Sequence, residues 1–563
     1  MKDIPATPET HHKSRAIAMV GVMLAIFLAA LDQTIVATAM PQIVKEFQGL
    51  EHLSWVFSAY MLASTVTIPI YGKLSDIYGR RIFFVAGILI FMAGSIMSGQ
   101  SQSMLQLILF RAFQGIGGGA IMVNAIAIIG DLFTPAERGR WQGLIGGVFG
   151  IASVAGPLVG GWLTDSFSWR WIFYINVPFG ILALAVLLIA LPKIKTAAVR
   201  RSIDFPGATT LGLALIALLL AFVWGGSQYT WGSVQIIGLF GATALLLALF
   251  ALIEGRAADP VLPLGLFANR GLNVSVIVTF LTSFGMFGAI AFVPLYAQSV
   301  VGFSATNSGL VLAPLSVGII ISSGIVGQVI SRTGKYKLSS IIGLAIAIVG
   351  MYLFSRLAVD TSKLALVRDM VILGLGIGVS FPIYTIVVQS SFDRSKLGIA
   401  TATIQLFRSI GSTVGVAIMG SMMNNSLADH LANVNSDPFV QTINRMNPDR
   451  AISGIDTNTL QNFLSVDGQQ RMAGLMENVP APQQAQVQEY YLQFIQTLKA
   501  ALAGSIGHVY ALGVFIIIAA FITTFFLPVI DLHRARKRPP VQELGVELEA
   551  EMGQAEPRDE PQL

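Results

Sequence analysis

The chain has 563 residues, of which 54% are hydrophobic and 12% are charged, and its mean hydropathy is +0.71. Soluble domains carry about 25% charged residues, so this composition indicates a polytopic membrane protein and not a soluble enzyme. The net charge of +5 does not indicate a nucleic-acid partner, because the basic residues gather in short segments between apolar runs. The absence of cysteine excludes disulfides, and the six histidines form no metal-binding motif.

Fourteen apolar runs are each close to the roughly 20 residues that an α-helix needs to cross a bilayer. They predict an all-α membrane protein with fourteen transmembrane helices. In chain order the predicted spans are 16–38, 53–71, 82–100, 105–130, 141–163, 171–191, 206–224, 233–254, 272–299, 305–330, 338–356, 366–388, 397–421 and 507–529. The first span is too long for a signal peptide and lacks a small-residue cleavage site.

Lysine and arginine are unevenly divided between the two sides of the predicted bundle. If the N-terminus is cytoplasmic, 24 of the 35 basic residues lie in cytoplasmic segments, 9 lie outside and two lie within spans. Cytoplasmic loops of membrane proteins carry the excess of Lys and Arg. We therefore predict a multi-pass protein of the cell membrane with both termini in the cytoplasm and with the basic run 533–538 as the last cytoplasmic anchor.

Two similar turns indicate an internal repeat. GKLSDIYGRR (72–81) follows the second span and GQVISRTGKYK (327–337) follows the tenth, and each has two glycines seven positions apart before basic residues. Such turns suggest two homologous halves. The predicted divisions are a cytoplasmic N-terminus (1–15), an N-terminal six-helix bundle (16–191), two additional helices (206–254), a C-terminal six-helix bundle (272–529) and a disordered cytoplasmic tail (530–563).

Residues 422–506 form a polar insertion in the C-terminal bundle and are predicted to be extracellular. Its last part, 480–510, has Tyr490, Tyr491, Phe494 and Leu498 at helical spacing and predicts a helix that enters the last span. We prefer the interpretation that the insertion is a packed hairpin that shields the helix ends. The alternative is a cap over the substrate exit or a surface that binds a partner.

The stretch LDQTIVATAMP (31–41) places a carboxylate, Asp32, inside the first span. An ionised acid costs at least about 2.5 kcal/mol at the centre of a membrane helix, so it is a functional candidate. Asp32 and Arg111 each lie about six or seven residues from the outer ends of their spans, which puts both roughly 9–10 Å below the outer surface. We expect them to lie close together, directly or through Gln114 or water, either to carry a proton or to fix helix packing.

The chain resembles the major facilitator superfamily, and five motifs carry the resemblance. GKLSDIYGRR is similar to its loop signature, RAFQGIGGGA (111–120) to its fourth-helix motif, and GLIGGVFGIASVAGPLVGGW (143–162) to the fifth-helix motif of its antiporters. LDQTIVATAMP and WRWIFYINVPFG (169–180) resemble its fourteen-helix drug:proton antiporter branch. The chain departs from this pattern at Ala37, where asparagine is frequent, and at Ala152, where glycine is usual.

The resemblance implies the family's fold of two six-helix bundles, with two extra central helices, and roles for three groups of residues. In the family an acid on helix 1 and an arginine on helix 4 are linked to proton coupling. They correspond to Asp32 and Arg111, with Gln114 as the neighbouring polar residue. A conformational latch in the first cytoplasmic turn corresponds to Gly72, Asp76, Gly79, Arg80 and Arg81. The antiporter motif corresponds to Gly156, Pro157, Gly160 and Gly161.

Physical chemistry leaves alternatives for two of these groups. Small residues four apart let helices approach closely and Pro157 bends its helix, but plain tight packing gives the same sequence pattern. The arginines of the turn also satisfy positive-inside anchoring whether or not they form a latch. For Asp32, burial favours the neutral carboxyl and Arg111 favours the carboxylate, so a site balanced between them can load and release a proton.

The inward-facing polar and aromatic residues are candidates for substrate binding. Mostly apolar walls with few acids suit bulky lipophilic compounds. Arg408 could instead be a hydrogen-bonding hub of the fold or bind an anionic group. The candidates are Gln33, Thr34, Tyr60, Asn124, Phe284, Phe287, Tyr296, Gln298, Tyr384, Gln389 and Arg408.

These observations predict a proton-coupled multidrug efflux antiporter that exports lipophilic or cationic compounds by alternating access and so contributes to antibiotic resistance. The chain lacks a phosphate-binding loop of the G-x-x-x-x-G-K-[ST] type, so the proton gradient, without any cofactor or metal, is the expected energy source. The expected partners are a small lipophilic substrate, protons and the lipid bilayer, with a periplasmic adaptor left open. An exporter or flippase of lipids or of one metabolite is the alternative, and a non-transporting membrane sensor a distant one.

Overall fold

The computed structural model describes residues 8–47, 53–191, 204–301, 312–446 and 481–529, without positions 227, 394–395 and 433. It also describes a few residues between 463 and 472. Within these ranges the chain is almost entirely helical, with one isolated β-bridge between Gly225 and Tyr229. The predicted all-α class is confirmed. The predicted tail 530–563 and the beginning of the tenth span lie outside the described residues.

The first bundle comprises the helices before residue 191. Long apolar helices alternate with short turns, and the sixth predicted span is interrupted at Ile175. Its helices are α1 (Pro8–Phe47), α2 (Leu53–Tyr78), α3 (Arg80–Gly99), α4 (Met104–Leu132), α5 (Pro135–Ser166), α6 (Trp171–Tyr174) and α7 (Asn176–Ala190).

The second bundle follows a peripheral helix pair, α8 (Phe205–Trp224) and α9 (Val234–Glu254), and the short helix η2 (Leu264–Ala268). The ninth predicted span ends in a π-helical turn, and the twelfth is divided between α15 and α16. The remaining elements are α10 (Arg270–Ile290), α11 (Val293–Tyr296), η3 (Ala297–Val301), α13 (Ala313–Thr333), α14 (Lys337–Ser355), α15 (Lys363–Gly378), α16 (Ser380–Ser391), α17 (Leu397–His430), η5 (Val434–Ser436), α18 (Pro438–Met446) and α21 (Ala481–Thr524).

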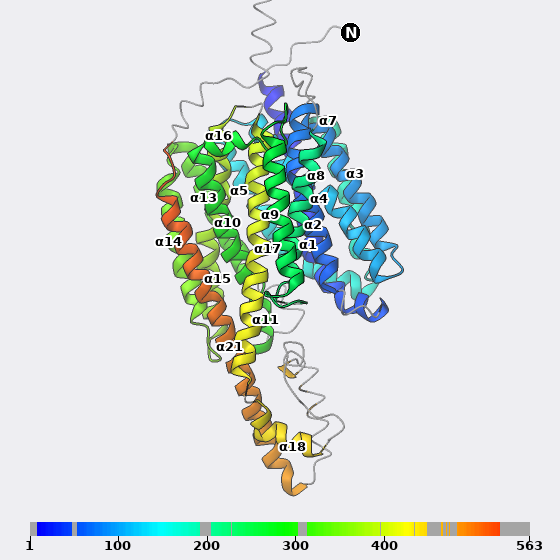
Figure 1. Ribbon diagram of the computed structural model, residues 1–563, viewed down its shortest axis with the longest axis vertical. Helices are drawn as coiled ribbons and strands as arrows, with labels where there is room; N and C mark the ends of the chain where they lie inside the picture. Colours follow the sequence, from blue (N-terminus) through cyan, green and yellow to red (C-terminus); the bar gives the residue numbers. More distant parts are fainter. Residues whose placement is uncertain are drawn as a thin grey trace, which may run out of the picture.

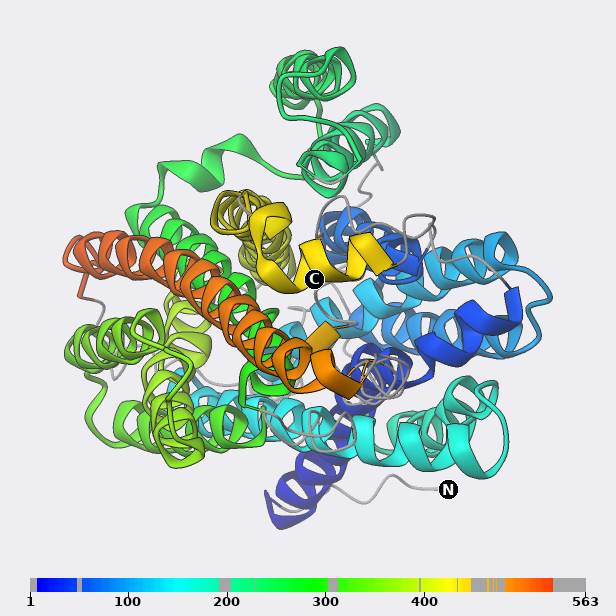
Figure 2. The same ribbon diagram turned by 90° about the horizontal axis from the view of Figure 1, so that it is seen from below.

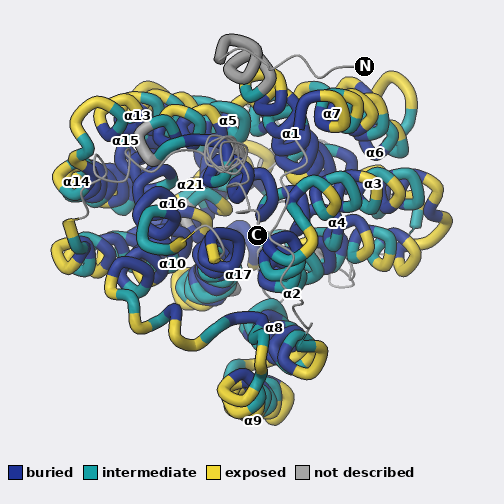
Figure 3. Tube along the Cα trace, turned by 90° about the horizontal axis from the view of Figure 1, so that it is seen from above, coloured by how far each residue is buried: buried dark blue, intermediate teal, exposed yellow. Residues whose placement is uncertain are grey.

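The two bundles lie side by side, and α8 stands outside them next to α2 and α17, with α9 packed on its outer side (Figures 1 and 3). Large apolar side chains on the outer faces are exposed; Ile189 and Val234 are 85% exposed and Leu364 is 79% exposed. Such a surface would be unfavourable in water but suits contact with lipid tails. In the described residues, thirteen helices are long and apolar enough to cross a membrane. The predicted span that is not among these thirteen is the second, 53–71, which lies in α2.

Helices α17 and α21 are longer than the predicted spans. Hydropathy placed their outer ends at residues 421 and 507, but α17 continues to His430 and α21 begins at Ala481 and runs for 44 residues without interruption. The predicted helix that enters the last span is therefore confirmed. In Figure 1, α21 extends well beyond the bundle and ends beside α18.

Aromatic side chains form a small core in this outer hairpin, which we define as α18 and the outer part of α21. The ring of Phe439 lies 5.1 Å from that of Phe494 and 5.2 Å from that of Tyr491. Phe439, Phe494 and Leu498 are completely buried. Most of the insertion between 447 and 480 lies outside the described residues, but the hairpin seen is packed and not merely polar.

We expect export to survive the loss of the hairpin's tip. Replacing residues 438–480 by a short Gly/Ser linker removes Phe439 and exposes Phe494, so the melting temperature should fall. Transport in vesicles should stay within a few-fold of normal, because the linker leaves the helices of both bundles in place. A protein that keeps its melting temperature but loses export would show instead that the hairpin acts as a cap or a docking surface.

Candidate functional site

A buried ion pair joins α1 and α4 in the first bundle. Asp32 and Arg111 are 0% and 1% exposed, and the Nη1 atom of Arg111 lies 2.5 Å from Oδ2 of Asp32. The same Nη1 donates to Oε1 of Gln114 at 2.6 Å, and the Gln114 amide donates to Oδ1 of Asp32 at 2.9 Å. Asp32, Arg111 and Gln114, which their depths in the membrane predicted to lie close together, are therefore in direct contact.

Local helix geometry explains how the three groups meet. Arg111 and Gln114 are three residues apart on α4, so they share one face of that helix. Glycines that follow them let α2 and α3 approach: a Cβ atom on Gly115 would lie 2.4 Å from the carbonyl oxygen of Tyr60, and one on Gly117 would lie 2.4 Å from the amide nitrogen of Phe91. The GIGGGA run therefore allows the dense packing that keeps water away from the ion pair.

A second amide from α7 completes the site. Asn176 donates through Nδ2 to Oδ1 of Asp32 at 2.9 Å and to Oγ of Ser95 at 2.9 Å. Ser95 in turn donates to the carbonyl oxygen of Phe173 at 2.9 Å. Neither Asn176 nor Ser95 was among the predicted residues. Asn176 lies in the quoted WRWIFYINVPFG motif, which was the available signal.

Arg111 has acceptors besides Asp32. Its Nη1 reaches Gln114, its Nε lies 3.4 Å from the carbonyl oxygen of Val56, and its Cζ lies 4.4 Å from the centre of the Tyr60 ring. Removing one partner of a buried ion pair usually costs about 3–5 kcal/mol because the remaining charge is uncompensated. Here the amide, carbonyl and aromatic contacts reduce that cost, so protonation of Asp32 need not leave Arg111 without an acceptor.

The WRW sequence of the same motif ties the start of α6 to the C-terminal end of α1. Trp169 donates to Glu46 at 2.6 Å and Arg170 donates to it at 2.8 Å. The hydrogen bond from Arg170, followed by the one from Trp169, lowers the pKa of Glu46 below its usual value. Glu46 is therefore ionised at neutral pH and holds the C-terminal end of α1 to the start of α6.

The turn between α2 and α3 contacts the other bundle through Asp76. Its Oδ1 and Oδ2 accept the backbone N–H groups of Gly398 and Ile399, at 3.1 and 2.9 Å, at the start of α17. A carboxylate at a helix N-terminus is favourable because the helix dipole is positive there. Asp76 also pairs with Arg80, whose Nε lies 2.9 Å from Asp131, an acid that the sequence analysis did not single out.

The other predicted latch residues have distinct tasks. Gly72 faces Ala402, whose Cβ would lie 2.4 Å from a Cβ atom at position 72. Gly79 has φ 98°, a value that favours glycine. The hydrogen bonds of Arg81 to described residues stay in the first bundle: it donates to the carbonyl oxygens of Leu188 and Leu191 at the end of α7, at 2.6 and 3.0 Å. This places Arg81 within the first bundle.

Two sets of glycines on α5 contact different partners. Gly156 and Gly160 face α1, where added Cβ atoms would lie 2.1 Å from Oγ1 of Thr34 and 2.4 Å from Oγ1 of Thr38. Gly139 faces Gly327 of α13, with a Cβ-to-carbonyl distance of 2.6 Å. The predicted close contacts at Gly156 and Gly160 are therefore inside one bundle, and the contact between bundles lies nearer the start of α5. A Cβ atom on Gly161 would meet nothing within 4 Å.

Several predicted substrate residues lie in helix contacts. Tyr384 is buried and bonds to Ser340 at 2.5 Å and Thr524 at 2.8 Å. Tyr296 is buried and donates to the carbonyl oxygen of Ala358 at 2.7 Å. Gln389 donates across the two bundles to the carbonyl oxygen of Ile126 at 3.1 Å.

The remaining candidates have varied surroundings. Thr34 donates to the carbonyl oxygen of Ala152 at 3.0 Å, and the amide of Asn124 donates within its own helix to that of Ala120 at 2.8 Å. Phe284 is buried, whereas Phe287 is 37% exposed and Gln33 is exposed. The side chain of Gln298 lies outside the described residues.

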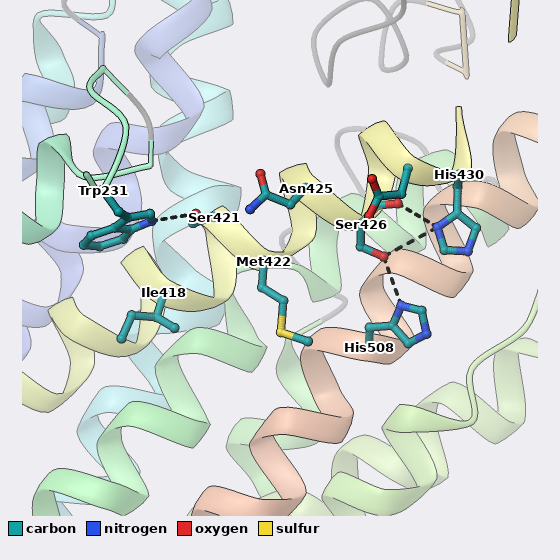
Figure 4. A pocket seen from close by; sticks show the side chains of 9 residues that line it. Trp231, Ile418, Ser421, Met422, Asn425, Ser426, His430 and His508 are labelled. Carbon is teal, nitrogen blue, oxygen red and sulfur yellow. Dashed lines mark hydrogen bonds between the residues drawn. The ribbon is translucent and has the colours of Figure 1, made fainter. Parts of the chain in front are cut away.

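A pocket of about 670 Å³ opens at the end of the molecule where α21 protrudes. Figure 4 shows that side chains from α17, from α21 and from the α8–α9 turn converge on it. The indole of Trp231 donates to Oγ of Ser421 at 2.8 Å, and Nδ1 of His508 lies 3.0 Å from Oγ of Ser426. The lining residues, absent from the sequence-based candidates, are Trp231, Ile418, Ser421, Met422, Asn425, Ser426, Asp429, His430 and His508.

Comparisons with known proteins agree with this architecture. The family model "Major Facilitator Superfamily" matches residues 22–416. The multidrug transporter protein MdtP of Bacillus subtilis is 39% identical over 533 residues, which cover 92% of this chain and 94% of MdtP. Multidrug resistance protein 3 of the same organism is also 39% identical, over 76% of this chain and 83% of its own length.

A solved structure supports the fold alone. The human organic anion transporter MFSD10 (TETRAN) superposes with a TM-score of 0.57 at 15% identity, covering 89% of this chain and 99% of that one. The fold and site define a polytopic membrane transporter, not an enzyme. The chain belongs to the major facilitator superfamily, which confirms the family predicted from the five motifs.

Asp76 should control access at the α2–α3 end of the molecule. We expect Asp76→Ala to speed maleimide labelling of a cysteine placed at Ala402, because the mutant loses the bonds to Gly398 and Ile399. The chain contains no cysteine, so this label is unique. Arg81→Gln is the matched control, since the hydrogen bonds of Arg81 go to Leu188 and Leu191 of the first bundle. Equal labelling rates in wild type and Asp76→Ala would contradict the latch.

Position 156 should tolerate no larger side chain. Gly156→Leu places atoms against Thr34, and overpacking typically costs about 1–3 kcal/mol, so the protein should fold but transport slowly or not at all. Gly161→Leu, five residues along the same helix, faces open space and should transport normally. Vesicle transport and melting temperature measured on both variants check this. Full transport by Gly156→Leu would show that the contact between α1 and α5 can open without loss of function.

Proposed function

We propose that the protein is a proton-coupled multidrug exporter in which Asp32 carries the proton and Arg111 and Gln114 respond to its charge. The observation that carries this proposal is the alternative set of acceptors around Arg111. An arginine that can pass from Asp32 to Gln114, the Val56 carbonyl oxygen and the Tyr60 ring permits a carboxyl to change charge inside a membrane.

The proposed cycle uses the contacts between the bundles. In the structure both carboxyl oxygens of Asp32 accept hydrogen bonds, from Arg111, Gln114 and Asn176. The bundles touch at the α2–α3 end through Asp76, Gly139 and Gln389. With both termini in the cytoplasm, as the distribution of basic residues predicts, this end is the cytoplasmic one. Protonation of Asp32 would then weaken the ion pair between α1 and α4. It would favour the conformation that is open at the cytoplasmic end and closed at the other, so that alternating access and proton movement are coupled.

The exported compounds are proposed to be lipophilic or cationic. The names of the two Bacillus subtilis relatives describe multidrug transport and multidrug resistance. The outer pocket fits such compounds, because its volume of about 670 Å³ and its mixture of Trp231, Met422 and hydrogen-bonding groups resemble a site for drug-sized ligands. We propose that it receives the compound on its way out, and that no cofactor is required.

Asp32→Asn should abolish transport driven by a pH gradient. The variant is nearly the same shape but cannot change charge, so liposomes containing it should not concentrate a fluorescent lipophilic cation when an outward proton gradient, with an acidic lumen, is imposed. Circular dichroism should show a folded protein with a modestly lower melting temperature. Asp32→Glu, which retains an acid, should keep partial activity, and Glu46→Gln, which alters an ion pair outside the network, should keep full coupling.

Two results would change the proposal. Concentrative, pH-driven uptake by Asp32→Asn would show that another group carries the proton. If wild-type liposomes move labelled phospholipid but none of a panel of dyes, the protein is a lipid exporter with the same fold.

A further inference from the structure

A second arginine lies deep in the C-terminal bundle without an acidic partner. Arg408 is on α17, eleven residues from the start of that helix and therefore ~16 Å along it. Its guanidinium donates to Oε1 of Gln405 at 2.5 Å and lies 4.9 Å from the centre of the Phe381 ring. Among the described residues no carboxylate forms an ion pair with it. This differs from Arg111, whose charge is balanced by Asp32.

Arg408 borders a small polar cavity between α10, the α15–α16 junction and α17. The space open to the centre of a water-sized sphere is about 10 Å³, and its walls include Thr279, Thr282, Ser283 and Ser380. Thr279 and Ser380 are 3% and 6% exposed, and their hydroxyl oxygens have no hydrogen-bond partner. Two buried hydroxyls and one guanidinium therefore border the same space with hydrogen-bonding capacity left over.

The chemistry of these groups favours an anion over a water molecule. Leaving a buried hydroxyl unpaired costs about 1–3 kcal/mol, and leaving a buried charge unpaired costs more. Water can satisfy the hydroxyls but cannot balance the positive charge. A small anion accepts hydrogen bonds from all three groups and neutralises the charge at the same time. The cavity volume restricts the occupant to one atom or one small group.

We propose that Arg408, Thr279 and Ser380 bind one small anionic group, either a halide ion or the carboxylate of an organic compound. This proposal rests on the proposed export function and gives a role to the buried charge of Arg408 in the second bundle. Asp32 and Arg111 balance each other, so Arg408 alone would repel a lipophilic cation from the pathway. A bound halide removes that repulsion, whereas a carboxylate on the exported compound would make Arg408 a direct contact to an anionic substrate.

The site can be tested by binding, without transport. The purified full-length protein is titrated with sodium chloride, or separately with sodium benzoate, against sodium HEPES at constant ionic strength, and its melting temperature is followed by tryptophan fluorescence. We expect a saturable rise with at least one anion. Arg408→Gln should weaken this binding by about tenfold or more, because it removes a charge-assisted hydrogen bond.

Matched variants separate binding from damage to the fold. Ser380→Ala and Thr279→Val each keep Arg408 and should weaken anion binding several-fold, whereas Arg408→Lys keeps the charge and should retain part of it. Ser390→Ala is the control, since Ser390 is another buried hydroxyl without a hydrogen-bond partner but does not line this cavity. If Arg408→Gln does not fold, the two hydroxyl variants still decide the question.

The two anions identify the source of the anionic group. A chloride response alone supports an inorganic halide, a benzoate response alone supports a substrate carboxylate, and responses to both support the shared chemistry. No saturable response to either anion, or a response unchanged in Arg408→Gln and Ser380→Ala, would overturn the proposal and leave a water-filled cavity. Asp32→Asn should bind the anion normally, so failure of proton coupling and failure of this site are distinguishable.

Discussion

The arrangement of the first bundle depends on the cost of a charge inside a membrane. An arginine on α4 cannot remain buried unless acceptors surround it, and α1, α2 and α7 each bring a group to Arg111 or to the acid that pairs with it. Asp32 comes from α1, Tyr60 and the Val56 carbonyl oxygen from α2, and Asn176 from α7. The glycines of α4 permit this convergence by letting neighbouring backbones approach. One buried charge thus fixes how four helices pack.

The contacts between the bundles follow a different physical rule. They use backbone groups and glycines: N–H groups of α17 meet Asp76, and the carbonyl oxygen of Gly327 meets Gly139. A hydrogen bond between neutral groups contributes about 0.5–1.5 kcal/mol, and one to a charged group such as the Asp76 carboxylate about 1.5–3 kcal/mol. Such contacts can form at one end of the molecule and break again within a transport cycle. The strong interactions stay inside the bundles, so each bundle can move as a unit.

The sequence predicted the Asp32–Arg111 contact because the helical rise converts positions in two spans into depths that can be compared. It could not predict Asn176 in the same way, since the rotation of α7 about its axis is not contained in a hydropathy profile. The same limitation affected Tyr384, Tyr296 and Gln389. A polar side chain on a membrane helix can face a cavity or satisfy its hydrogen bonds on a neighbouring helix, and these three do the latter.

Helix length showed a related limitation. Hydropathy marks where a helix leaves the lipid, so it ended the thirteenth span at residue 421 although α17 continues to His430. The glycines of α5 were recognised from their spacing, but spacing does not tell which helix they face. Only the structure separates Gly156, which faces α1, from Gly139, which faces α13. The number and order of helices were therefore more predictable than which helices contact one another.

The uninterrupted α21 has a mechanical consequence. The residues that directly follow its C-terminal end are fastened to the second bundle, where Tyr336 donates to the carbonyl oxygen of Pro528 at 2.5 Å and Lys337 donates to that of Phe525 at 2.7 Å. Figure 2, which views the molecule from the end where α21 protrudes, shows α21 crossing the bundle beside α17. Because a continuous helix resists bending, α21 is a rigid lever. A tilt of the second bundle swings the outer hairpin through a wider arc, and a molecule that grips the hairpin from outside would restrain that tilt.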